Sequence, residues 1–281
     1  MDVWKEHLLT AEEQKGFETD GYFLVENALS AGHVVRLCEA MDRCETEARD
    51  AKGGEAEKRL NQHDLIERDP SFMDMIDLPT TFPKVWGLMG WNIHLFHTQM
   101  VITPPHTQER IEKRLGWHQD NNRMNKDFET SIMSHPRVSM KVAYFLSDTR
   151  EVGRANFYIV PGSHISGGVQ FANEDDLMPE GALPTQVKPG DALFFDRRLW
   201  HAASANVTDV ERRVLFYGYS YRWLQTKSNM DLAHLYDQAD PIRRQLLGHA
   251  TSGNGRFSPL EEDVPLREWI RENLGEEAVA A

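Results

Sequence analysis

Three residues of this chain have the types and the spacing to bind one metal ion. His118 and Asp120 stand two positions apart, with Gln119 between them. In an extended chain, positions i and i+2 face the same side, so this imidazole and this carboxylate can reach one cation while Gln119 points away. His201, which follows an apolar run, is the best candidate for the third ligand. Two histidines and one carboxylate leave about three positions open on iron(II), which is the arrangement of non-haem oxygenases.

An arginine farther along the chain has the chemistry to bind an anionic co-substrate. Arg212 follows His201 by eleven positions, on a run that reads as the next strand. A guanidinium there can form a bidentate pair with the distal carboxylate of 2-oxoglutarate. Its neighbour Arg213 would point to the opposite side of the strand.

Two other classes of protein remain as alternatives. A cupin-like metal-dependent isomerase or hydrolase would also use histidine and aspartate, although it would gain nothing from Arg212. A non-catalytic jelly-roll binding module would need no metal. A closed zinc site is disfavoured, because it normally requires four ligands, usually with thiolates, and Cys38 and Cys44 are not placed to help.

The elements that must position these residues divide the chain into three zones. One domain of residues 1–281 is expected, with a helical N-terminal cover over 1–90, a β core over 91–225 and C-terminal helices over 226–281. Short apolar runs separated by turn residues predict a β-sandwich or barrel for the middle zone. Its expected strands are Ile93–Thr103, Val138–Leu146, Ala155–Val160, Thr185–Val187, Ala192–Phe195 and Val214–Tyr221.

Composition and charge narrow the class of partner. The net charge of −13 disfavours nucleic acid as a partner, because phosphates require lysine and arginine. It indicates either an ordinary acidic surface or steering of a cationic substrate. No apolar run approaches the roughly 18–20 residues of a membrane span, and the N-terminus lacks the pattern of a secretory signal. With only two cysteines, a cytoplasmic location is expected.

Several motifs in order resemble the phytanoyl-CoA dioxygenase family of iron(II)/2-oxoglutarate oxygenases. The resemblance extends over about residues 10–225 and is carried by several motifs in order. The matching segments are Asp20-Gly-Tyr-Phe-Leu-Val, His97-Thr-Gln-Met-Val-Ile-Thr-Pro-Pro, Trp117-His-Gln-Asp, Pro161-Gly-Ser-His, Gly190-Asp-Ala-Leu-Phe-Phe-Asp, and finally His201, Asn206 and Arg212.

The resemblance implies both a fold and a set of site residues. The fold is mainly β with flanking helices, around a double-stranded β-helix (jelly-roll, cupin-like) core. His118, Asp120 and His201 would bind iron(II), and Arg212 would bind the C5 carboxylate of 2-oxoglutarate. Many members have a serine where this chain has Ala203, so Ser204 or another hydroxyl is expected to be recruited instead.

Further polar residues are candidates to line the site. Gln99 and His97 share one face of the strand over 93–103, and either can bind the C1 carboxylate of 2-oxoglutarate. Lys141 lies among apolar strand residues and faces either the cavity or the outside. The polar loop after the metal motif is a candidate for contacts with substrate; its residues are Asn121, Asn122 and Arg123.

The expected activity is oxidation of an unactivated C–H bond with iron(II), 2-oxoglutarate and dioxygen. Hydroxylation and oxidative cyclisation are both open. Because Asp120 fills the position that relatives with halogenase activity leave to chloride, oxygenation is favoured. The resemblance extends to the branch that tailors antibiotics, including orthosomycin oxygenases, so a small-molecule substrate of cationic or sugar-like character is expected. An acyl-CoA or amino-acid substrate is the alternative.

Overall fold

A computed structural model describes residues 2–52, 58–106, 115–120, 136–166, 168–173 and 176–279. Contacts within the chain form two compact units. The first unit consists of Met1–Thr10, His63–Thr98 and Tyr217–Ala281, and the second of Ala11–Gln62 and Gln99–Phe216. All three candidate metal ligands belong to the second unit. One domain over residues 1–281 stays a prediction.

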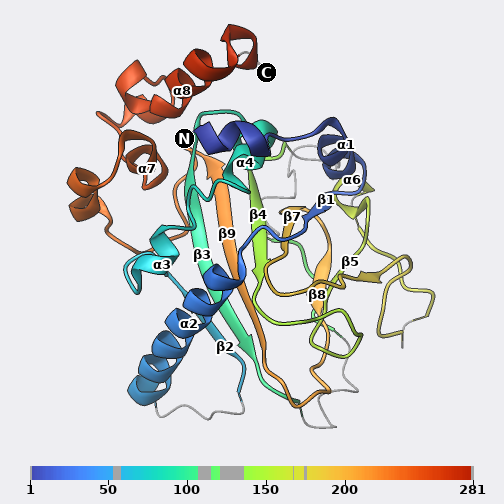
Figure 1. Ribbon diagram of the computed structural model, residues 1–281. Helices are drawn as coiled ribbons and strands as arrows, with labels where there is room; N and C mark the ends of the chain where they lie inside the picture. Colours follow the sequence, from blue (N-terminus) through green and yellow to red (C-terminus); the bar gives the residue numbers. More distant parts are fainter. Residues whose placement is uncertain are drawn as a thin grey trace. The chain divides into compact units, whose positions relative to one another are not determined.

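Helices precede and follow a region rich in strands (Figure 1). The helical elements are η1 (Asp2–His7), α1 (Ala11–Thr19), α2 (Ala31–Lys52), α3 (Pro70–Met73), α4 (Phe82–Met89), α6 (Ser163–Ser166), η3 (Ala233–Gln238), α7 (Pro241–Leu246), η4 (Asn254–Arg256), η5 (Glu261–Asp263), α8 (Pro265–Leu274) and η6 (Glu276–Ala278). The strands are β1 (Tyr22–Val25), β2 (Leu60–His63), β3 (Ile93–Thr103), β4 (Ser139–Phe145), β5 (Phe157–Ile159), β6 (Leu183–Pro184), β7 (Ala192–Asp196), β8 (His201–Ala203) and β9 (Arg212–Tyr221).

The strands form two sheets. The larger sheet has six strands in the order β1-β7-β4-β9-β3-β2, and the smaller has three in the order β6-β5-β8. The long strands β3 and β9 lie side by side in the larger sheet (Figure 1). Antiparallel pairing places Val142 opposite Phe194 in the larger sheet and Ile159 opposite His201 in the smaller one.

Alternation along the strands of the second unit produces its apolar core. Alternate residues of β4, β5, β7 and β9 point into one buried cluster, which Val101 of β3 and two residues outside the strands, Val187 and Leu199, complete. The cluster consists of Val101, Ala143, Phe145, Phe157, Ile159, Val187, Leu193, Phe195, Leu199, Val214 and Phe216. By the same alternation, Lys141 shares the inner face of β4 with Ala143, and Arg212 shares the inner face of β9 with Val214. The charged side chains of Lys141 and Arg212 therefore both extend from the apolar face of the sheet.

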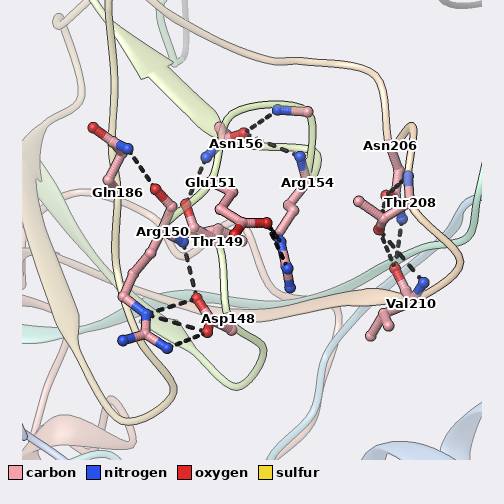
Figure 2. Close-up of polar contacts among 11 residues, drawn as sticks. Asp148, Thr149, Arg150, Glu151, Arg154, Asn156, Gln186, Asn206, Thr208 and Val210 are labelled. Atoms are coloured by element: carbon pink, nitrogen blue, oxygen red, sulfur yellow. Dashed lines mark hydrogen bonds and ion pairs between the residues drawn. The ribbon is translucent and has the colours of Figure 1, made fainter.

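Two buried asparagines, Asn156 and Asn206, each bond several groups of a loop in the second unit (Figure 2). The side chain of Asn156 accepts hydrogen bonds from the backbone N–H groups of Gly153 and Arg154 and donates to the carbonyl of Thr149. Asn206 does the equivalent in the loop between β8 and β9. Because each amide group satisfies several backbone groups at once, both loops are held in one conformation without regular secondary structure.

The first unit has a core of its own built on aromatic rings. The ring centroid of Trp4 lies 5.3 Å from that of Phe82 and 4.9 Å from that of Trp269. Two tyrosine hydroxyls of β9, Tyr217 and Tyr219, each donate a 2.8 Å hydrogen bond to a carbonyl in or just after α3. No helix in the described part of the chain combines the length and the apolar character needed to cross a membrane.

Most expected strands are present, with three differences. Thr185–Val187 was expected as a strand, and this is wrong: the residues that pair with β5 are Leu183 and Pro184, while Thr185 uses both its amide and its hydroxyl to bond the carbonyl of Phe157. The other two differences are strands that were not expected. The residues of β2 are too polar to show an alternating pattern, and β8 is only three residues long.

Candidate metal centre

His118 and His201 are paired directly across two antiparallel segments. The amide of His118 donates to the carbonyl of His201, and the amide of His201 donates to the carbonyl of His118, both over 3.0 Å. Residues paired in this way project their side chains to the same face. The two imidazole ring centroids consequently lie 4.3 Å apart.

Both imidazoles are oriented by the same local hydrogen bond. Nδ1 of His118 lies 2.7 Å from the carbonyl oxygen of Gly116, and Nδ1 of His201 lies 2.8 Å from that of Leu199. A carbonyl only accepts, so each Nδ1 carries the proton and each Nε2 keeps a lone pair. This is the tautomer that a metal ligand requires, and the bonds fix the ring direction before any metal arrives.

Aromatic side chains enclose His201. The ring of Phe157 stacks on the imidazole with centroids 5.0 Å apart, and Phe195 meets it edge-on at 5.3 Å. Burial lowers the pKa of His201 to about 4, against its ordinary value of 6.5. The imidazole is therefore neutral at physiological pH, as metal binding needs.

Asp120 completes the group. One ligand atom from each of His118, Asp120 and His201 lies within 4.8 Å of the others, the only such cluster of metal-binding side chains in the part of the chain that the structure describes. The amide of Asp120 donates to the carbonyl of Arg197, which fixes its backbone. Burial alone would raise the pKa of its carboxyl group, but the charge and the hydrogen bond of Lys141 hold that pKa well below its ordinary value. The carboxylate is ionised.

Arg212 is a buried cation with free hydrogen-bonding capacity. The residue is 3% exposed, and neither Nε nor Nη2 has a hydrogen-bond partner among the described residues. Burial, and secondarily the charge of Arg59, lower the pKa of Arg212 to about 9, so the group is still protonated at neutral pH. An unpaired buried charge is costly, and an anion bound there would relieve the cost.

A strip of the inner sheet face connects Asp120 with Arg212. At one end, Nζ of Lys141 contacts Asp120 and lies 5.7 Å from the ring centroid of Phe216. At the other end, the guanidinium of Arg212 lies 5.7 Å from the ring centroid of Phe145. Lys141 and Phe145 are four residues apart on β4, and Phe216 and Arg212 are four residues apart on the neighbouring strand β9. The two ends of the strip are therefore roughly 13 Å apart. The strip between them is apolar, so a molecule with an anionic group at each end would find polar partners only at the two ends.

The remaining residues expected at the site have other contacts. Gln99 donates to the side chain of Asn61 over 2.8 Å, and the hydroxyl of Ser204 donates to the carbonyl of Ala205. His97, in the first unit, has its Nε2 2.9 Å from Nδ1 of His63. Their roles in binding 2-oxoglutarate stay predictions. Asn121, Asn122 and Arg123 lie outside the described residues.

Some features of the site were not expected from the sequence. The carbonyls of Gly116 and Leu199 each stand two positions before a histidine, so the repeated spacing was a signal that could have been used. No such signal marked Arg59, whose charge acts on Arg212, because Arg59 follows a polar segment with no pattern of its own. Arg213 does point away from the site, toward Asp42 and Glu211, as alternation predicted.

The loop held by Asn206 connects the strand of His201 with that of Arg212. The Asn206 side chain donates to the carbonyl of Val210 and accepts from the amide and hydroxyl of Thr208 (Figure 2). It also donates to the carbonyl of Thr103. We expect Asn206→Ala to lower the free energy of unfolding by roughly 2–4 kcal/mol, because several buried backbone groups lose their partner. Chemical denaturation measures this change.

A matched variant controls for this prediction. Thr208→Val removes the hydroxyl that bonds Asn206 and leaves the amide contacts in place, so it should cost about 1 kcal/mol or less. If Asn206→Ala were no more destabilising than Thr208→Val, the loop would not depend on the buried amide.

The sequence of this chain is similar to a known protein family and to individual known proteins. The profile of the family described as Phytanoyl-CoA dioxygenase (PhyH) matches residues 17–214, which is more than half of the chain. "Dioxygenase af480" of Aspergillus fumigatus is 24% identical over 158 residues, a match that covers 55% of this chain and 46% of that protein. The chain thus spans about half the length of this relative.

Two solved structures show the same fold. HygX from Streptomyces hygroscopicus, with nickel and 2-oxoglutarate bound, matches with a TM-score of 0.63 at 18% identity. The match covers 80% of this chain and 91% of the HygX chain. The epimerase SnoN from nogalamycin biosynthesis has a TM-score of 0.55 at 20% identity and covers 74% of this chain and 79% of its own. The expected double-stranded β-helix core is confirmed.

Antiparallel sheets with a His–Asp–His cluster and a buried arginine define a jelly-roll protein of the metal-dependent oxygenase class. The chain belongs to the phytanoyl-CoA dioxygenase (PhyH) family. Members are iron(II)- and 2-oxoglutarate-dependent dioxygenases, and this chain is an enzyme of that class.

Proposed function

We propose that this enzyme uses iron(II), 2-oxoglutarate and dioxygen to oxidise an unactivated C–H bond of a polar small molecule, by hydroxylation or oxidative cyclisation. The observation that carries the proposal is the convergence of ligand atoms from His118, Asp120 and His201 within 4.8 Å. Two neutral nitrogen donors and one carboxylate suit iron(II) and leave positions for a chelating 2-oxo acid and dioxygen. A cytoplasmic location stays part of the proposal.

Each residue of the site has its own role in this proposal. His118, Asp120 and His201 hold iron(II), and the two unpaired nitrogens of Arg212 receive the C5 carboxylate of 2-oxoglutarate. When bound, the metal and 2-oxoglutarate supply the oxidising chemistry, in which the 2-oxo acid is decarboxylated to succinate and the substrate C–H bond is oxidised. The rings of Phe157, Phe195 and Phe216 keep the inner face apolar and exclude water.

The substrate we favour is an intermediate of natural-product or antibiotic biosynthesis, of oligosaccharide or aminoglycoside type. The similar proteins support this choice, since HygX has been solved with hygromycin B bound and SnoN with nogalamycin RO. The net charge of −13 also favours a cationic molecule over the phosphates of coenzyme A.

A turnover assay with a substrate panel tests the proposal. Purified protein with iron(II) and 2-oxoglutarate should release succinate several times faster when an aminoglycoside or oligosaccharide is present, because bound substrate couples decarboxylation to oxidation. Acyl-CoA esters and amino acids are the comparison set. Stimulation by CoA esters alone would contradict the substrate class, and no dependence on iron or 2-oxoglutarate would contradict the enzyme class.

A further inference from the structure

Lys141 is the one described lysine whose ammonium group contacts a candidate metal ligand. Its Nζ lies 2.9 Å from both carboxylate oxygens of Asp120. The two side chains are 13% and 12% exposed, so the pair is largely removed from water. At this burial the contact is much less screened than a surface ion pair.

Among the residues that the structure describes, no competing partner draws Lys141 away from Asp120. Within the described residues, Asp120 is the only hydrogen-bond acceptor for its Nζ. The other close neighbour is the ring of Phe216, which attracts the ammonium group but accepts no conventional hydrogen bond. The lysine stem leaves the inner face of β4 next to Ala143, so its direction is set by the sheet. The ammonium group therefore stays with Asp120.

A metal ion at the His–Asp–His cluster must share this carboxylate with Lys141. A free carboxylate can bind a metal through one oxygen or through both, and the second mode uses an additional coordination position. Although Nζ of Lys141 is equally distant from both oxygens, its hydrogen bond is accepted by Oδ1, so a metal that binds through Oδ2 alone leaves this hydrogen bond intact. Since 2-oxoglutarate and dioxygen together need the remaining positions, one-oxygen binding by Asp120 keeps the site open.

We propose that Lys141 is a positioning residue that holds one oxygen of Asp120, so that the metal receives only the other and 2-oxoglutarate can chelate. The proposal rests on the function proposed above. It predicts that loss of the ammonium group affects 2-oxoglutarate more than the metal itself.

The test compares Lys141→Met with Lys141→Arg, using Mn(II) and 2-oxoglutarate as the probes in calorimetry. Lys141→Met keeps the apolar stem and removes the charge. We expect it to bind Mn(II) within a few-fold of the wild-type affinity but to bind 2-oxoglutarate about 10–100-fold more weakly, because the second oxygen of Asp120 would then compete for a coordination position that the 2-oxo acid needs. Lys141→Arg should restore most of the loss. The visible absorption of the Co(II) form gives the coordination number independently of turnover.

Two controls separate the possible failures. Lys188→Met removes a surface lysine that pairs with Glu26 and should leave both affinities unchanged. If Lys141→Met destabilises the fold, Lys141→Gln keeps a donor of similar length and should lose less than Lys141→Met. Wild-type affinity for 2-oxoglutarate in Lys141→Met, or an equal loss in Lys141→Arg, overturns the role of Lys141. Failure of the wild-type protein to bind Mn(II) instead contradicts the proposed function.

Discussion

A His118→Ala, Asp120→Asn double variant is expected to fold normally, to bind iron(II) far more weakly than the wild type and to release no succinate above background. Two of the three ligands are lost, so the affinity should fall by more than the roughly 10–100-fold typical of residues that only orient a ligand. His118 is exposed, and asparagine still accepts a hydrogen bond from Lys141, so little stability should be lost. Metal titration and a succinate assay give the result.

The residue between the two ligands provides the matched control. Gln119 points away from the cluster and donates to the carbonyl of Arg198. Gln119→Ala changes the same segment without touching the cluster, so it should keep most of its metal affinity and turnover. Succinate release that persists unchanged in the double variant would mean that the chemistry takes place elsewhere in the molecule.

The His118–Asp120 part of the metal cluster was predictable because its information is local. His118 and Asp120 share a face by the two-residue period of an extended chain, and that period is visible in a single sequence. The strands that carry Phe195 and Phe216 were predictable for the same reason, since alternating or continuous apolar runs are typical of strands in a buried sheet. Neither inference required any knowledge of which segments meet.

Contacts between distant segments were not predictable in this way. The pairing of His118 with His201, and the contact of Lys141 with Asp120, depend on which strands are neighbours, and no local pattern encodes that. The strand β8 shows the same limit: it is three residues long and is defined mainly by its partner Phe157–Ile159. The sequence left the direction of Lys141 undecided between cavity and exterior, because only the position of Asp120 settles it.

The exchange Arg212→Met should separate the stability of the protein from its affinity for 2-oxoglutarate. Replacing a buried arginine that has two unpaired nitrogens by an apolar side chain of similar length removes an uncompensated charge, so we expect the unliganded protein to be unchanged or more stable, by up to about 1–4 kcal/mol. The bidentate partner of the C5 carboxylate disappears at the same time. A charge-assisted hydrogen bond contributes roughly 1.5–3 kcal/mol, so 2-oxoglutarate should bind about 10–150-fold more weakly.

Thermal unfolding with and without 2-oxoglutarate, in the presence of Mn(II), measures both effects on one sample. In the wild type, 2-oxoglutarate should raise the melting temperature, because a ligand that binds only the folded state stabilises it. In Arg212→Met that increase should largely disappear while the metal-dependent increase remains. Arg213→Met is the adjacent control: its guanidinium pairs with Asp42 and Glu211 outside the site, so this variant should keep the response to 2-oxoglutarate. If Arg213→Met lost the response and Arg212→Met kept it, the co-substrate would bind on the other face of β9, away from the metal cluster.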